Sequence, residues 1–255
     1  MLLCGAMSPA SHDLDPASPS RSDVARGLAV HMLTASGAGF GLLALAAAIE
    51  RRFALCFAWL GAALLVDGLD GALARRLRAS ETAAFIDGAL LDLVVDYLTY
   101  VVVPLIALWR SDLAPRAPVL ACAWIVACAS ALYFADRRMK TADLWFRGLP
   151  ACWNVVVFYL FAFRPPAWAT LAVLLVGAAL MFAPIAGVHP LRVRRLRALT
   201  IAATLLWLAS AAATIERNFS PSFMTQTGLA LSGLYFVALS VWRGRPDRSL
   251  APFEG

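Results

Sequence analysis

The sequence predicts an all-α polytopic integral membrane protein with about eight transmembrane helices. Of its 255 residues, 61% are hydrophobic and only 15% are charged, and the mean hydropathy of +0.74 lies above the usual soluble range. Apolar runs of about twenty residues, long enough to cross a bilayer as a helix, follow one another with short polar joints between them. Their length and their lack of period-two alternation favour helices over the strands of a membrane barrel.

Eight apolar segments are expected to form the spans. Each is separated from the next by a joint that contains charges or turn formers, in chain order ERR, RRLRASET, RSDLAPRAP, ADRRMK, FRPPAW, HPLRVRR and ERNFSPS. The segments cover approximately residues 29–49, 53–74, 83–109, 117–135, 148–163, 166–187, 197–215 and 223–242.

The distribution of Lys and Arg predicts the orientation in the membrane. Sixteen of the 22 lie in the amino tail, in the joints after the second, fourth and sixth segments, and in the carboxyl tail. Because positively charged joints stay on the cytoplasmic side, both termini are expected there. The formal net charge of +6 then requires no nucleic-acid partner, since basic cytoplasmic joints also meet anionic lipid headgroups.

The chain is expected to consist of a membrane domain with two short tails. The tails are a mobile cytoplasmic amino tail (1–25), rich in Pro, Ser and Asp, and a cytoplasmic carboxyl tail (244–255), and the membrane domain covers 26–243. The five cysteines show no CxxC spacing and lie mostly in apolar runs, so neither a disulfide framework nor a zinc site is indicated.

The stretch DGLDGALARRLRASETAAFIDGALLDLVVD, residues 67–96, places carboxylates in apolar sequence. Asp67 and Asp70 are three residues apart near the cytoplasmic end of the second span, and Asp92 and Asp96 are four apart in the third. Each pair therefore projects from one face of its helix, and a helical hairpin can bring the two faces together. Because an ionised carboxylate inside a membrane is costly unless it is paired or metal-bound, a functional role is predicted.

Two interpretations of these carboxylates are open. Four converging oxygen ligands suit a hard cation, Mg²⁺ or Mn²⁺, which commonly completes its shell with substrate phosphates. Alternatively, Arg75, Arg76 and Arg78 neutralise them in a buried network that serves packing alone, but buried ion pairs are a poor source of stability, and we favour the metal site. A fifth carboxylate, Asp87, is turned off the metal face and is expected to contact Arg76 or Arg78.

The pattern D-x-x-D-G-x-x-A-R followed by G-x-x-x-D-x-x-x-D resembles the signature of the CDP-alcohol phosphatidyltransferases. The matching positions are Asp67, Asp70, Gly71, Ala74, Arg75, Gly88, Asp92 and Asp96. Twelve residues lie between the two halves of the pattern, more than most of that family has, and this spacer resembles the bacterial phosphatidylcholine synthases. The stretches HMLTASGAG and VHPLRVRRLRALT, and the residues after the fourth span, extend the likeness over nearly the whole chain after about residue 25.

The resemblance implies an activity and a site. It implies transfer of the phosphatidyl group of CDP-diacylglycerol to the hydroxyl of choline, giving phosphatidylcholine and CMP, in a bacterial inner membrane with the site facing the cytoplasm. It implies that one or two Mg²⁺ or Mn²⁺ ions are held by Asp67, Asp70 and Asp92 together with Asp96, which is also the candidate base. A homodimer is implied by the likeness alone.

The remaining candidate residues would hold the two substrates. The nucleotide and phosphates are expected to contact Gly71, Ala74, Arg75, Gly88 and Arg147. Choline carries a permanent positive charge and no N–H donor, so a selective site needs aromatic faces. The candidates for that role are Tyr97, Tyr100, Tyr133, Trp145 and Trp153, although aromatic side chains at helix ends are more often interfacial anchors.

Two other functions are weighed against this one. A sister enzyme of the same family would use serine, glycerol phosphate or inositol phosphate as acceptor; the long spacer and the extended likeness favour choline. A cation transporter would place its carboxylates near the membrane midplane and on broken helices. The carboxylates here cluster toward one surface, which favours the enzyme.

Overall fold

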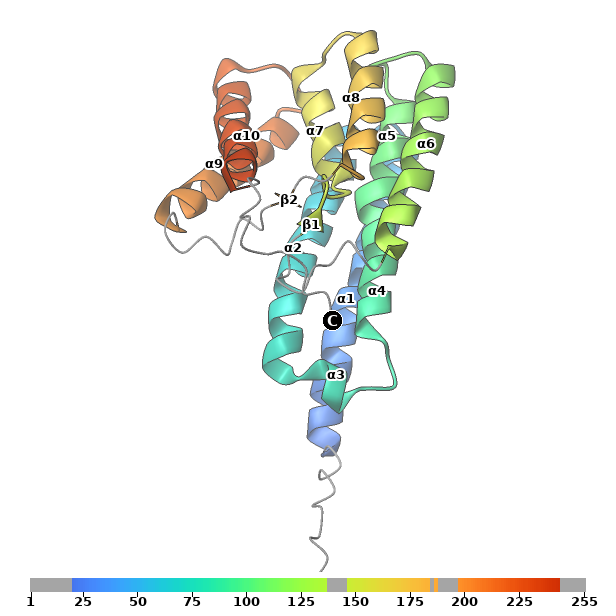
Figure 1. Cartoon of the computed structure of the whole chain (residues 1–255), viewed down its shortest axis with the longest axis vertical. Helices are drawn as coiled ribbons and strands as arrows, with labels where there is room; N and C mark the ends of the chain where they lie inside the picture. The colour runs from blue at the N-terminus through green and yellow to red at the C-terminus, as the bar shows by residue number, and fades with distance from the viewer. Residues whose placement is uncertain (1–19, 137–145, 184–185, 188–196, 244–255) are drawn as a thin grey trace, which may run out of the picture.

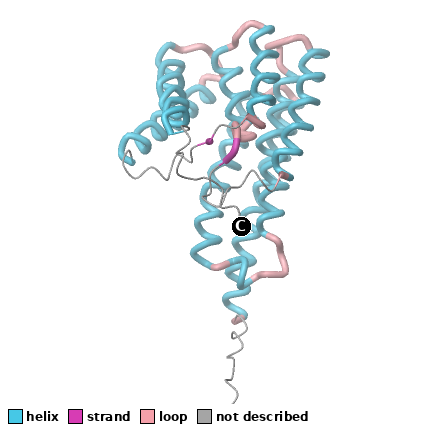
Figure 2. The backbone as a smooth tube through the Cα atoms, in the orientation of Figure 1, coloured by secondary structure: helices cyan, strands magenta, loops and turns pink. Residues whose placement is uncertain are grey.

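The computed structural model describes residues 20–136, 146–183, 186–187 and 197–243. The described chain is almost entirely helical, and most helices run along the long axis of the molecule (Figure 1). Its strands are the two-residue β1 (Phe146–Arg147) and β2 (Ala186–Gly187), which pair antiparallel. Strand residues are coloured magenta in Figure 2. The prediction of an all-α fold is confirmed.

Long apolar helices make up most of the fold. The elements are α1 (Arg21–Ile49), α2 (Phe53–Leu77), α3 (Ala79–Thr82), α4 (Gly88–Asp96), the π-helix η1 (Tyr97–Val102), α5 (Val103–Arg110), α6 (Arg116–Ala135), α7 (Trp153–Phe163), α8 (Ala167–Leu180), α9 (Arg197–Glu216) and α10 (Phe223–Arg243). Helices α4, η1 and α5 follow one another directly and form one long helix.

The eight predicted segments each correspond to an apolar helix. In the part of the chain that the structure describes, five are long and apolar enough to cross a membrane, namely α1, α2, the α4–η1–α5 helix, α6 and α9. The shorter apolar helices are α7, α8 and the Phe223–Leu239 part of α10. The chain is therefore a multi-pass membrane protein. Helix α1 begins at Arg21, eight residues before the first predicted segment.

Helices α7 and α8 are shorter than the sequence predicts. Helix α7 begins at Trp153 rather than at residue 148, and α8 ends at Leu180 rather than at 187. Gly148 adopts φ 84°, and a Cβ there would collide with the carbonyl oxygen of Met181. The Leu149 N–H donates to the carbonyl of Leu180 at 3.0 Å. The backbone around Gly148 is non-helical in an apolar part of the chain. It is packed against protein and hydrogen-bonded, which is the condition under which a membrane protein tolerates non-helical backbone.

A π-helical turn follows Asp96 in the third long helix. Pro104 lies two residues beyond η1, has no N–H, and its ring would clash with the carbonyl of Tyr100 four residues earlier in a regular α-helix. The N–H of Val103 bonds instead to the carbonyl of Leu98, five residues back, which is the π-helical pattern. We attribute the widened turn to Pro104.

Glycines allow α1 to pack closely against the long helix that contains α4. A Cβ on Gly37 would lie 2.6 Å from Cγ1 of Val95, and one on Gly41 would lie 2.8 Å from Cδ2 of Leu98. Helix α1 also contacts α2 along much of its length (Figure 1). Small residues at such interfaces are the usual means of close helix approach in membranes. The result is a compact group of α1, α2 and α4.

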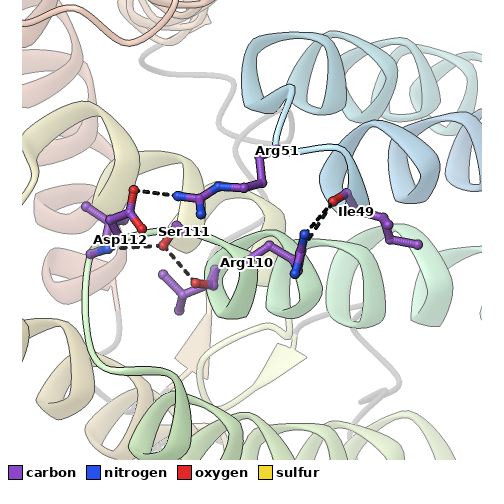
Figure 3. Close-up of polar contacts among 7 residues, drawn as sticks. Ile49, Arg51, Arg110, Ser111 and Asp112 are labelled. Atoms are coloured by element: carbon purple, nitrogen blue, oxygen red, sulfur yellow. Dashed lines mark hydrogen bonds and ion pairs between the residues drawn. The ribbon is translucent and has the colours of Figure 1, made fainter.

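Polar contacts join α1, α2 and α5 at the end away from the predicted carboxylate site (Figure 3). Arg110 donates to the carbonyl of Ile49 from Nε and Nη2, at 3.2 and 2.9 Å, which satisfies a carbonyl left without an intrahelical partner at the end of α1. Arg51 forms an ion pair with Asp112. Because Asp112 is largely exposed, we expect this pair to contribute little to stability.

The packing of α8 on α7 generates a stability prediction. A Cβ on Gly177 would lie 2.7 Å from Cη2 of Trp153, which is 2% exposed and donates its indole N–H to Ser130 at 3.0 Å. Gly177→Ala is therefore expected to destabilise the protein by about 1–3 kcal/mol through overpacking. The measurement is the thermal unfolding midpoint in detergent.

Gly39→Ala in α1 is the matched control, because no heavy atom lies within 4 Å of a Cβ built there. That variant is expected to match the wild type or to gain about 0.5–1 kcal/mol from helix propensity. Equal midpoints for the two variants would contradict the packing described.

Candidate metal centre

The four carboxylates of the sequence pattern line one cavity. Helix α2 provides Asp67 and Asp70, and α4 provides Asp92 and Asp96, so the hairpin does bring the two helix faces together. The other lining residues are small or apolar apart from two threonines, namely Thr34, Gly37, Ala63, Val66, Val95 and Thr99.

Three of the carboxylates are close enough to share one ion. Oxygens of Asp67, Asp70 and Asp92 all lie within 4.8 Å of one another. Since Mg²⁺ binds oxygen at about 2.0–2.1 Å, two of its ligand atoms are at most about 4.2 Å apart, and small side-chain rotations would close the difference. Asp70 is 5% exposed, and Asp67 and Asp92 are partly buried. The donor set and its spacing therefore fit a hard divalent cation.

Asp96 lines the same cavity but does not belong to the group of three. It lies one helical turn beyond Asp92, at the last residue of α4 and directly before the π-helical turn. The cavity therefore contains a fourth carboxylate, which is not part of the group of three that could share an ion.

Arg75, Arg76 and Arg78, at the carboxyl end of α2, do not neutralise the first carboxylate pair. In the described residues, no Lys or Arg side chain forms an ion pair with Asp67 or Asp70. Arg78 pairs instead with Glu81 at 3.9 Å, and both are exposed. A buried Asp–Arg packing network is therefore not what holds these two aspartates in place.

The amino end of α4 has structural roles that the sequence pattern did not predict. Asp87 is the N-cap of α4, and its side chain accepts from the Leu90 N–H at 3.0 Å. The expected ion pair of Asp87 with Arg76 or Arg78 is not formed, because the carboxylate is engaged at the helix end.

Gly88 accommodates a side chain from α1. A Cβ there would lie 2.7 Å from Cε1 of His31, which is buried. Helix packing thus explains why position 88 needs a glycine. Contact between Gly88 and the nucleotide stays a prediction.

Gly71, Ala74 and Arg75 lie on α2 just beyond the aspartates. A Cβ on Gly71 would approach only Nη1 of Arg75, at 3.5 Å, so the guanidinium lies over the glycine. Arg75 is exposed, and its cationic group lies next to the residue that follows Asp70. For Arg147 the structure describes only the backbone, in β1, and its phosphate contact stays a prediction.

Two tyrosines of η1 have different partners. The Tyr100 hydroxyl donates to Oδ2 of Asp67 at 2.6 Å, which connects the third long helix to a carboxylate of α2. The Tyr97 hydroxyl donates to the carbonyl of Ala127 in α6 at 3.0 Å. Of these two tyrosines, Tyr100 is therefore the one that contacts a cavity residue, through its hydroxyl.

Of the other proposed choline-binding aromatics, Tyr133 and Trp153 lie in the hydrophobic core. Trp153 packs against Gly177 and Ser130 in the core, so its ring stabilises the α6–α7–α8 interface. Its contact with choline stays a prediction. Tyr133 is also buried, at 5% exposure. Trp145 lies outside the described residues.

The contribution of α1 was not predicted. Thr34 and Gly37 line the cavity opposite the carboxylates of α2 and α4. Both belong to the stretch HMLTASGAG, in which small and polar residues interrupt an apolar span, and that composition is the signal that could have indicated a cavity wall.

Comparison with known proteins identifies relatives along most of the chain, although no protein-family model matches it. A phosphatidylcholine synthase of Mesorhizobium japonicum is 42% identical over 205 residues, covering 80% of this chain and 76% of the relative. One from Bradyrhizobium diazoefficiens is 43% identical, with 86% and 81% covered. One from Pseudomonas aeruginosa is 39% identical, with 86% and 92% covered. The chain therefore belongs to the phosphatidylcholine synthase family.

Proposed function

We propose that this protein transfers the phosphatidyl group of CDP-diacylglycerol to the hydroxyl of choline, producing phosphatidylcholine and CMP. The proposal rests on a cavity lined by Asp67, Asp70, Asp92 and Asp96 in a chain that is 38–43% identical to phosphatidylcholine synthases. A sister enzyme with another acceptor is disfavoured, because the relatives that are similar over most of the chain are all named phosphatidylcholine synthase.

The proposed cofactor is Mg²⁺ or Mn²⁺, held by Asp67, Asp70 and Asp92. Carboxylate oxygens are the ligands that both ions prefer, and three of them converge here. When bound, the ion would supply the positive charge that neutralises the pyrophosphate of CDP-diacylglycerol and the departing CMP. Arg75, whose guanidinium lies beside Gly71, would add charge-assisted hydrogen bonds to the same phosphates.

Asp96 is the proposed general base. In this scheme Asp96 accepts the proton of the choline hydroxyl, whose oxygen forms a bond to the phosphorus next to diacylglycerol. The bond between that phosphorus and the oxygen of CMP breaks, and CMP leaves with the bonding electron pair. The separation of Asp96 from the three-carboxylate group supports a role distinct from theirs.

The protein is proposed to lie in a bacterial inner membrane with the cavity facing the cytoplasm. The cavity residues of α2 and α4 flank the basic joint after the second span, on the side to which most Lys and Arg residues are assigned.

The proposed function predicts which acceptor supports the reaction. Membranes that contain the protein should release CMP from CDP-diacylglycerol with choline and not with serine, glycerol phosphate or inositol phosphate. A phosphorylated acceptor needs an additional basic pocket, and serine needs partners for a carboxylate and an ammonium group. The measurement is chromatographic quantification of CMP. Release with serine alone would overturn the assignment of choline.

The metal role predicts a contrast between two aspartates of one helix. Asp92→Asn should weaken Mn²⁺ binding by about tenfold or more, because it removes one of three anionic ligands. Asp87→Asn is the control, since asparagine also caps helices and position 87 is outside the cavity. Binding is measured by the loss of the free Mn²⁺ electron paramagnetic resonance signal in nanodiscs. Equal weakening in both variants would exclude a specific site.

The base role predicts a separation of turnover from metal binding. Asp96→Asn should lower kcat by about 10²–10⁴-fold, because it removes the proton acceptor. Its Mn²⁺ affinity should stay close to that of the wild type, because Asp96 is not one of the three clustered ligands. Unchanged kcat would exclude Asp96 as the base, and a parallel loss of Mn²⁺ affinity would make it a metal ligand.

A further inference from the structure

We propose that Tyr100 is a positioning residue for the metal: its hydroxyl fixes the Asp67 carboxylate so that the second oxygen of Asp67 is presented to the ion. The inference rests on the proposed function, in which Asp67 is a metal ligand. It assigns Tyr100 a task different from the choline contact predicted from the sequence.

A short hydrogen bond joins Tyr100 to Asp67. The Tyr100 hydroxyl lies 2.6 Å from Oδ2 of Asp67, the short distance typical of an O–H donor and an ionised carboxylate. Both side chains are partly buried, so water competes little for the bond. A carboxylate held through one oxygen loses most of its freedom to rotate, and this pre-arranges the ligand before the ion binds.

The backbone around Tyr100 departs from a regular α-helix. Tyr100 lies within η1, the widened turn that we attribute to Pro104. Tyr97, three residues earlier on the same turn, sends its hydroxyl to Ala127 of α6. Tyr100 therefore contacts a residue of the carboxylate cavity and Tyr97 contacts a neighbouring helix, although both lie in the same short segment.

The position of Tyr100 also links the ligand to the proposed base. Asp96 lies about one helical turn before Tyr100 on the same long helix. A phenol has a single O–H to donate, and here the Asp67 carboxylate receives it. The bond therefore joins a proposed metal ligand of α2 to the long helix that carries Asp96.

The two roles for Tyr100 are separated by removing only the hydroxyl. Tyr100→Phe keeps the aromatic face that would hold choline and deletes the hydrogen bond to Asp67. Tyr97→Phe is the matched control, because it deletes a hydroxyl of the same turn whose partner is a backbone carbonyl outside the cavity.

The experiment is a Mn²⁺ titration of both variants and the wild type in nanodiscs without substrates, followed by electron paramagnetic resonance. Tyr100→Phe is expected to raise the Mn²⁺ dissociation constant by about 10–100-fold, the usual effect of losing a partner of a metal ligand. Tyr97→Phe should match the wild type. At saturating Mn²⁺, the KM of Tyr100→Phe for choline should be unchanged.

A double-mutant cycle removes the ambiguity of a general loss of folding. If Tyr100 acts through Asp67, Tyr100→Phe should have no further effect on Mn²⁺ affinity in an Asp67→Asn background. Wild-type affinity in Tyr100→Phe, equal weakening in Tyr97→Phe, or additive effects in the cycle would overturn the inference. If Asp92→Asn binds Mn²⁺ as the wild type does, the metal site of the proposed function fails, and the inference fails with it.

Discussion

The energetic cost of carboxylates inside a membrane is the constraint on which the rest of this structure depends. Asp70 is buried, and Asp67, Asp92 and Asp96 converge with it on one cavity. Each charge loses hydration there, and bringing like charges together adds repulsion. A helix arrangement with this cost is retained when something is gained from it. Binding of a divalent cation, which these oxygens would ligate and which could in turn bind anionic phosphates, is the gain that fits them.

The surrounding helices bring the carboxylates together by close packing. Gly37 and Gly41 let α1 approach the long helix that begins with α4, and Gly88 admits His31 at the start of that helix. The twelve-residue spacer forms α3 and a turn that ends at the Asp87 cap, which fixes where α4 begins. The start of α4 in turn determines which of its residues face α2. At the opposite end, the contacts of Figure 3 hold α1, α2 and α5 together.

Much of this arrangement was predictable because its signals are local. Helix length follows from apolar runs, and the convergence of the four aspartates follows from spacings of three and four residues. Other features depend on contacts between distant residues. Hydropathy does not separate a span from buried non-helical backbone, so the ends of α7 and α8 around Gly148 were predicted wrongly. The packing of Trp153 in the core and the direction of Tyr100 likewise follow from neighbours in space, Gly177 and Asp67.

The central claim is that the aspartate cluster and the phosphates of CDP-diacylglycerol bind the same ion. The most direct measurement is electron–nuclear double resonance of Mn²⁺ bound to the protein in nanodiscs, with and without CDP-diacylglycerol. If the cluster and the substrate phosphates bind one ion, ³¹P hyperfine coupling to Mn²⁺ should appear when the substrate is added and should be absent in Asp92→Asn. Mn²⁺ that binds at the wild-type cluster but shows no ³¹P coupling with saturating substrate would contradict it.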